Sequence, residues 1–315
     1  MLDLVRLSRR HLFPPGGVEL YRQIALLTDL APDLEVLDVA CGHGVCLEYF
    51  VTEYGVHGSG VDYDPAMVDV SEERARKADL SERMHFQQAD LAALPYRDEI
   101  FDVVVGELGL ASRADPETAV RELVRVTKPG GRVVLVQLVW KAPVEEARRT
   151  VLSEHLGARP LMLVEWKRIL LEAGVTNLHT EDWSDEETAF RPQIKKPFPD
   201  FSELFSLPEK LGILRRAWGR WGFQGVRTAV TRELEVHRVL TRERILGLDL
   251  VIGTRKVVDA PLAQDDETPQ DAAEGPEAAT SADPASAQDA GEKPPPESAS
   301  SDVDGLPLFT TREDR

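Results

Sequence analysis

The chain has 315 residues, 42% hydrophobic and 6% aromatic, which suffices for one large core or two smaller ones. Its formal net charge is −18, but residues 259–315 hold fifteen acids against three bases, which leaves −6 on residues 1–258. A net negative charge disfavours binding to nucleic acid. The sequence has no apolar run long enough to span a bilayer and no secretory signal, so we expect a cytoplasmic protein. Cys41 and Cys46 have no partners for a disulfide framework or a metal site, so we expect no metal.

From residue 35 to residue 137, short β-branched runs alternate with segments of helical period, which is typical of β-α-β units. A helix is expected at 18–30, before the first strand. The expected strands are 35–40, 56–61, 84–87, 101–106 and 131–138. Asp64 and Asp115 each precede a proline, so each should cap a helix that begins at that proline.

The later part of the chain is less regular. Helices are expected at 144–155 and 161–172 and strands at 175–182 and 248–257, with a helical insert at 185–246 that we expect to form several short helices. Together these elements predict a doubly wound, Rossmann-like α/β fold with a seven-stranded, mostly parallel sheet. Residues 1–258 form its domain, whereas 259–315 have the composition of a disordered acidic tail.

The most informative segment is a loop of small residues after the first strand. Asp38 lies near the end of that strand, Ala40, Cys41, Gly42 and Gly44 follow it, and a helix begins near Val45. A dinucleotide site would require a third glycine where Leu47 stands, and the Asp38 carboxylate would repel a pyrophosphate. A cofactor with an ammonium group would instead be attracted by Asp38.

Two further acids follow later strands. Asp62, followed by Tyr63, ends the second strand, and its carboxylate could accept hydrogen bonds from both hydroxyls of a ribose. Asp90 follows the third strand and could accept from the amine of an adenine, on whose ring Leu91 would pack. Each acid could also serve only to cap a helix or a turn.

These segments resemble class I S-adenosylmethionine-dependent methyltransferases, and are closest to the small-molecule type of ubiquinone and menaquinone biosynthesis. The resemblance covers about residues 12–182 and includes VLDVACGHG, ADLAALPYRDEIFDVVV and VTKPGGRVVLVQ. It implies S-adenosyl-L-methionine as cofactor, with its methionine part held by Asp38, Ala40, Cys41, Gly42 and Gly44, its ribose by Asp62 and Tyr63, and its adenine by Asp90 and Leu91. Glu107, after the fourth strand, would border the methyl group.

The acceptor side is less defined. Glu107, Tyr21, His155 and Glu154 are candidates for a general base, although each is also explained as a surface or core residue. We expect a small-molecule acceptor, which the sequence does not identify, and it does not fix the oligomeric state. The alternatives are a protein or lipid acceptor, or a non-catalytic cofactor-binding scaffold.

The insert is the most individual feature. Residues 209–244 hold nine Lys and Arg against four Glu, and the cluster Trp218, Trp221 and Phe223 lies among them. This composition fits a lid over an acceptor, an amphipathic surface that contacts a membrane, or a solvated helical hairpin whose aromatic residues pack on the core.

Overall fold

The computed structural model describes residues 14–156, 158–184, 205–239 and 243–257, together with Leu4 and Leu7. The expected acidic tail at 259–315 and the first part of the insert, 185–204, lie outside the described residues. None of the helices in the described ranges has the length and hydrophobicity needed to cross a bilayer.

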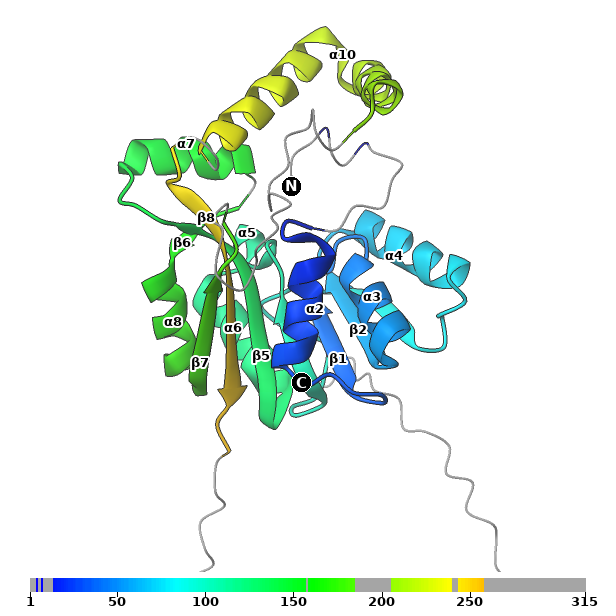
Figure 1. Cartoon of the computed structure of the whole chain (residues 1–315), viewed down its shortest axis with the longest axis vertical. Coiled ribbons are helices and arrows are strands. Elements are labelled where there is room, and N and C mark those ends of the chain that lie inside the picture. The colour runs from blue at the N-terminus through cyan, green and yellow to red at the C-terminus, as the bar shows by residue number, and fades with distance from the viewer. Residues whose placement is uncertain are drawn as a thin grey trace, which may run out of the picture. The chain divides into compact units, whose positions relative to one another are not determined.

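A mostly parallel sheet forms the centre of the fold (Figure 1). Its order is β3-β2-β1-β4-β5-β8-β7, with β8 antiparallel to both neighbours and the short β6 paired to β5. The strands are β1 (Glu35–Val39), β2 (His57–Asp62), β3 (Met84–Gln88), β4 (Phe101–Gly106), β5 (Thr127–Trp140), β6 (Leu161–Met162), β7 (Val175–Asp182) and β8 (Leu246–Arg255). The predicted seven-stranded, doubly wound sheet is confirmed, and the two-residue β6 is an addition to it.

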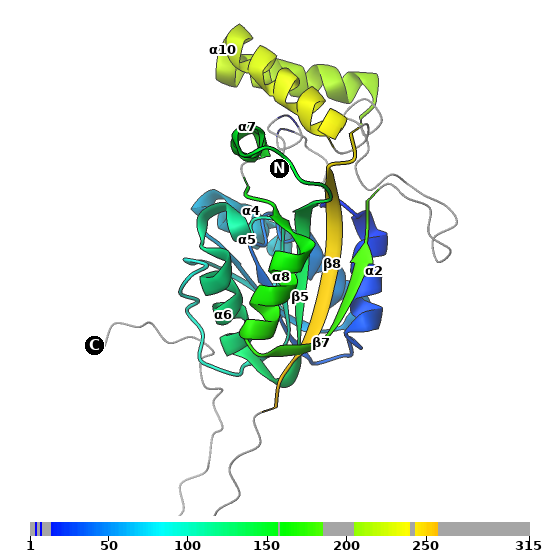
Figure 2. The ribbon, with the colours of Figure 1, turned by 90° about the vertical axis from the view of Figure 1, so that its left-hand side faces the viewer.

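Helices cover both faces of the sheet (Figure 2). The helices of the described residues are α2 (Gly17–Leu27), α3 (Val45–Tyr54), α4 (Pro65–Lys77), α5 (Leu110–Arg113), α6 (Pro116–Val126), α7 (Glu146–Leu156), α8 (Leu163–Glu172) and α10 (Leu207–His237), of which α7 and α10 lie beyond the end of the sheet. Alternate residues of β1 show the two layers, because Val36 packs with α2, α3 and α4 whereas Leu37 and Val39 pack with α5, α6 and α8.

The predicted helix starts follow from their capping residues. The Asp64 side chain accepts a hydrogen bond from the Ala66 amide at 3.0 Å, and Asp115 accepts one from the Thr118 amide at 3.0 Å. The strand expected to begin at residue 131 begins at Thr127 instead. Its pairing with β4 passes from Thr127 directly to Arg132, so the intervening Pro-Gly-Gly turn bulges out of a longer strand.

The described part of the insert differs from the expected series of short helices. It is one helical element, α10, which is interrupted at Gly222. The backbone there has φ 64° and ψ −174°, a conformation that is essentially restricted to glycine. The chain turns at this point, so that Ile213 and Ala217 before it share a buried cluster with Ala229 after it. The insert therefore forms a helical hairpin.

Candidate functional site

Three carboxylates come together where β1, β2 and β4 end. The strands are parallel neighbours, with Asp38 of β1 opposite Gly60 of β2 and Val105 of β4. Asp62 is the last residue of β2, and Glu107 directly follows β4. Because the strand order reverses direction between β1 and β4, this is the crevice in which doubly wound sheets bind ligands.

The loop after β1 exposes its backbone to this crevice. Ala40, Gly42 and Gly44 all have positive φ, and a Cβ at Gly42 would meet no atom within 4 Å. A Cβ at Gly44 would lie 2.7 Å from the ring of Phe86, so this glycine is required for packing. The loop thus combines an open face at Gly42 with a tightly packed base at Gly44.

Asp62 braces that loop. Its two carboxylate oxygens accept hydrogen bonds from the amides of Gly42 and Asp64, each at 3.0 Å. The alternative reading of Asp62 as a local capping residue therefore describes part of its role. A carboxylate oxygen can accept more than one hydrogen bond, so both oxygens keep capacity for hydroxyl groups of a ligand.

Asp38 has no such structural role in the described part of the chain. Its side chain is fully buried, and neither carboxylate oxygen has a hydrogen-bond partner. Burial, followed by the neighbouring charges of Glu107 and Asp62, raises the pKa of Asp38 well above its usual range. An unpartnered buried carboxylate destabilises the free protein, and a cationic ligand would relieve this cost.

Glu107 is held in place from three sides. Tyr21 of α2 donates a hydrogen bond from its hydroxyl to Glu107 Oε1 at 2.8 Å, and the Cys46 thiol also donates to this carboxylate. Gln137 of β5 donates to the Glu107 carbonyl oxygen at 2.8 Å. Burial raises the pKa of Glu107 to about 7, against the lowering effect of the Tyr21 and Cys46 hydrogen bonds.

Cys46 is a site residue that the sequence analysis missed, because it considered this cysteine only for a disulfide or a metal site. One ligand atom from each of Asp38, Cys46 and Glu107 lies within 4.8 Å of the others, an arrangement that could also hold a metal ion. The signal for this proximity was available in the sequence, because Cys46 is the second residue of a helix that begins at the carboxyl end of β1.

A second cluster lies beside Asp62. Tyr63, Gln88, Ala89 and Asp90 line a shallow pocket after β2 and β3. Asp90 is exposed, and one of its oxygens accepts a hydrogen bond from the Ala92 amide at 2.9 Å, as in a simple turn. Leu91 is 1% exposed and packs in the core, so the expected packing of its side chain on an adenine ring does not fit this structure.

The remaining candidate bases lie elsewhere in the contact network. His155 Nδ1 forms an ion pair with Glu235 of α10 at 2.7 Å, and no contact recorded for the described residues joins it to the three carboxylates. Glu154 is exposed on α7. Of the four candidates, only Tyr21 and Glu107 are brought together.

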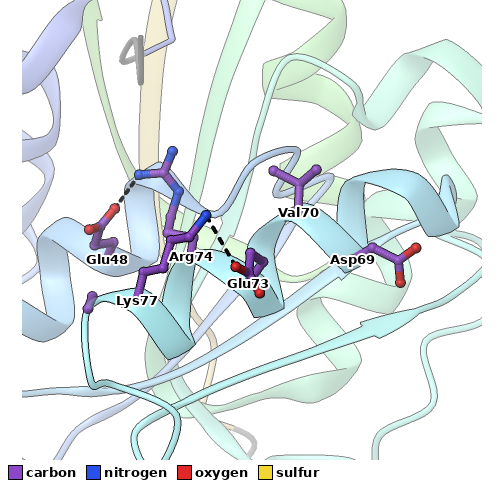
Figure 3. A pocket seen from close by; sticks show the side chains of 7 residues that line it. Glu48, Asp69, Val70, Glu73, Arg74 and Lys77 are labelled. Atoms are coloured by element: carbon purple, nitrogen blue, oxygen red, sulfur yellow. Dashed lines mark hydrogen bonds and ion pairs between the residues drawn. The ribbon is translucent and has the colours of Figure 1, made fainter. Parts of the chain in front are cut away.

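A separate groove lies between α3 and α4 (Figure 3). Glu48 of α3 and Arg74 of α4 form an ion pair there, and Arg74 also donates to the His43 carbonyl oxygen at 2.8 Å. None of the residues predicted to hold the cofactor lines this groove. We therefore assign Arg74 a bracing role for the loop after β1.

Three relatives and a family model were identified by sequence. A methyltransferase domain family matches residues 37–135. Methyltransferase GfsG of Streptomyces halstedii is 26% identical over 65% of this chain and 74% of its own length. An uncharacterized protein of Haemophilus influenzae is 30% identical over 60% of this chain and 76% of its own. The demethylmenaquinone methyltransferase of Streptomyces griseus is 37% identical, over 45% of this chain and 58% of its own.

Solved structures share the fold. The [4+2]-cyclase SpnF matches with a TM-score of 0.59 and 22% identity, over 76% of this chain and 82% of its own. Phosphoethanolamine N-methyltransferase 2 of Haemonchus contortus, solved with S-adenosyl-L-methionine, matches with a TM-score of 0.58 and 17% identity, over 78% of this chain and 54% of its own. At these identities the likeness establishes the architecture alone.

Proposed function

Because the chain belongs to the class I S-adenosylmethionine-dependent methyltransferases, we propose that it transfers the cofactor's methyl group to a small-molecule acceptor where β1, β2 and β4 end. The chain is accordingly an enzyme with S-adenosyl-L-methionine as its cofactor. One observation carries the choice of site. Asp38 is a fully buried carboxylate without a hydrogen-bond partner in the described structure, next to an open glycine loop.

The residues at the strand ends fit the groups of this cofactor. Asp38 and the backbone from Ala40 to Gly44 would hold the methionine part. Its ammonium group would supply the positively charged hydrogen-bond partner that the Asp38 carboxylate lacks in the described structure. Asp62 and Tyr63 would hold the ribose. The pocket lined by Tyr63, Gln88, Ala89 and Asp90 would take the adenine.

The sulfonium of the bound cofactor supplies an already activated methyl group, so the protein's task is to position the acceptor for in-line displacement. Tyr21 and Glu107 border the place where the acceptor would approach. Glu107, with its pKa of about 7, could hold or accept a proton from the acceptor near neutral pH. Tyr21 fixes the orientation of that carboxylate.

The acceptors for which relatives of the chain are named support a small acceptor. Besides the demethylmenaquinone enzyme, the 27-O-demethylrifamycin SV methyltransferase of Amycolatopsis mediterranei is 36% identical over 173 residues. These names describe different acceptor molecules. We therefore propose the class of acceptor and leave its identity to experiment.

The test is transfer of label from methyl-labelled S-adenosyl-L-methionine into a cell extract separated into small-molecule, protein and lipid fractions. We expect label in the small-molecule fraction with the wild-type chain and a large loss of that label with Asp38→Asn. Label that entered only protein would contradict the proposed acceptor class. The exposed Asp69→Ala on α4 is the matched control, because it removes an acid outside the proposed site.

A further inference from the structure

The first half of α10 has two apolar faces. One face is buried, because Ile213 and Ala217 pack against Ala229 of the second half, together with Leu4 and Phe205. A helix at the surface of a globular protein usually needs one such stripe, with polar residues on the opposite side. The second apolar face of α10 is exposed.

The exposed face forms a continuous stripe. Leu207, Leu211, Leu214 and Trp218 follow one another at spacings of four, three and four residues, which places them along one side of a helix. Leu207 and Leu211 are 75% and 72% exposed, and Trp218 is 56% exposed. Phe223, just after the break at Gly222, extends the stripe, because its ring lies edge-on to Trp218 at a centroid distance of 5.7 Å. We call these five residues the α10 stripe.

The charges of α10 are sorted between its inner and outer sides. Its three acids are used internally: Glu209 accepts from the Ser206 amide at 2.8 Å, buried Glu233 accepts from the Leu4 amide, and Glu235 pairs with His155. The exposed charged residues of α10 are all basic, and they are Arg215, Arg220 and Arg227. The exposed residues of α10 are therefore apolar, neutral or basic, with no exposed acid among them, on a chain whose net charge is −18.

We propose that the outward face of α10 is a docking surface for an anionic lipid membrane. Leucines and aromatic rings in line along a helix can enter the region between headgroups and acyl chains, while arginines beside them bind lipid phosphates. The stripe from Leu207 to Trp218 spans about 17 Å at 1.5 Å per residue, so the helix would lie in the plane of the surface. The acidic remainder of the chain would be repelled, which selects this one face.

This orientation directs the proposed active site toward the bilayer. Trp140, the last residue of β5, packs with Val236 near the end of α10. Since β5 runs parallel to β4, α10 lies at the end of the sheet that carries Glu107 (Figures 1 and 2). The inference goes beyond the proposed methyl transfer and does not require it, because membrane binding can be measured without cofactor or acceptor.

The test is flotation of the full chain with phosphatidylcholine vesicles and with vesicles that also contain phosphatidylglycerol. We expect binding to the anionic vesicles only, weakened when salt rises from about 0.1 M to about 0.5 M. Two double variants should each weaken this binding by about tenfold or more, Leu211→Ser with Trp218→Ser and Arg215→Glu with Arg220→Glu. The tryptophan fluorescence emission should shift to shorter wavelength on binding. This shift should be absent from the variant in which Trp218 is replaced by serine.

Matched controls separate the stripe from general surface effects. Val164→Ser with Leu171→Ser removes two exposed apolar residues of α8, and Arg76→Glu with Lys77→Glu reverses two exposed charges of α4. Both controls should bind vesicles as the wild type does. Cofactor affinity should stay unchanged in all four double variants, which shows that they are folded and separates this test from that of the methyltransferase proposal.

Three results would overturn the proposal. They are no binding to anionic vesicles, equal losses in the controls and the α10 variants, or binding to neutral vesicles that the arginine variant does not change. Sedimentation of the wild type without lipid measures self-association, which would give a further contrary outcome. Self-association that Leu211→Ser with Trp218→Ser abolishes, without vesicle binding, would assign the stripe to a second copy of the chain.

Discussion

At the scale of single residues, the candidate site is defined by how differently its three carboxylates are satisfied. Asp62 accepts two backbone amides, Glu107 accepts from Tyr21 and Cys46, and Asp38 accepts from no described group. Mutation of a group that stabilises the free protein should lower its free energy of unfolding. Mutation of a group that is satisfied only by a bound ligand should leave this free energy unchanged or raise it. Two predictions rest on this difference.

Asp38→Asn should keep or raise the stability of the cofactor-free protein while weakening cofactor binding. Asparagine is close in shape to the aspartate and removes a buried, unpartnered charge, so the free energy of unfolding should not fall. The loss of charge attraction should cost about 1.4 kcal/mol or more, which is tenfold in affinity. Thermal unfolding with and without S-adenosyl-L-methionine measures both effects. A less stable variant with unchanged affinity would show that Asp38 is structural.

Glu107 should make the cofactor-free protein less stable as pH rises. Its pKa increases from the ordinary value of 4.5 to about 7 in the folded chain, so between these values the folded chain holds a proton that the unfolded chain has released. Stability is therefore highest at the acidic end and falls by up to about 3 kcal/mol through this window. Urea unfolding at several pH values should show a shallower fall for Glu107→Gln, whereas parallel curves would refute the assignment.

At the scale of elements, strands and capped helices could be predicted from the sequence and the insert could not. The strand at 101–106 matches β4, and the strand at 175–182 matches β7, because both are short apolar or β-branched runs between clear turn residues. The helices that begin after Asp64 and Asp115 were predictable because each aspartate caps a helix and is followed by a proline. The hairpin of α10 depends on the backbone angles at Gly222, and one glycine among several gives no pattern that marks it as the break.

The turn at Gly222 gives a prediction for α10. Gly222→Ala should destabilise the hairpin by about 1 to 3 kcal/mol, because φ 64° with ψ −174° is unfavourable for any residue with a Cβ. The matched control is Gly219→Ala, which lies within the helix with open space at its Cβ position and should be neutral or slightly stabilising. Hydrogen exchange in α10 measures the effect. Equal protection in the two variants would show that the break is not held by this residue.

Some features of the candidate site could be predicted from the sequence and others could not. The acids at strand ends were predictable, since parallel strands place their carboxyl ends at one edge of the sheet. The pairing of Tyr21 with Glu107 was not, because the two residues are 86 positions apart and their contact depends on how α2 packs on the sheet. The burial of Leu91 was missed for the same reason, since an apolar residue in a loop can face a ligand or the core.

At the scale of the whole molecule, charge is divided between regions of different character. Residues 259–315 carry a net charge of −12 in a chain of −18, while the exposed charges of α10 are positive. We propose that residues 1–258 fold and bind cofactor without the acidic segment. If α10 docks on anionic lipid, the acidic segment opposes that docking by repulsion at long range.

Removal of residues 259–315 should therefore leave two properties unchanged and alter a third. Thermal stability and cofactor affinity should equal those of the full chain, and binding to anionic vesicles should become tighter, most clearly at low salt. Calorimetry and vesicle flotation measure these quantities on the same preparations. A shortened chain that fails to fold would contradict the proposed domain boundary.

The central claim is that acids at the ends of β1 and β2 hold S-adenosyl-L-methionine, and titration calorimetry with the cofactor tests it most directly. Wild type and Asp69→Ala should bind with equal affinity, whereas Asp62→Asn, with folding verified by circular dichroism, should bind at least about tenfold more weakly. Equal affinity of Asp62→Asn and Asp69→Ala would place the cofactor elsewhere and contradict the account.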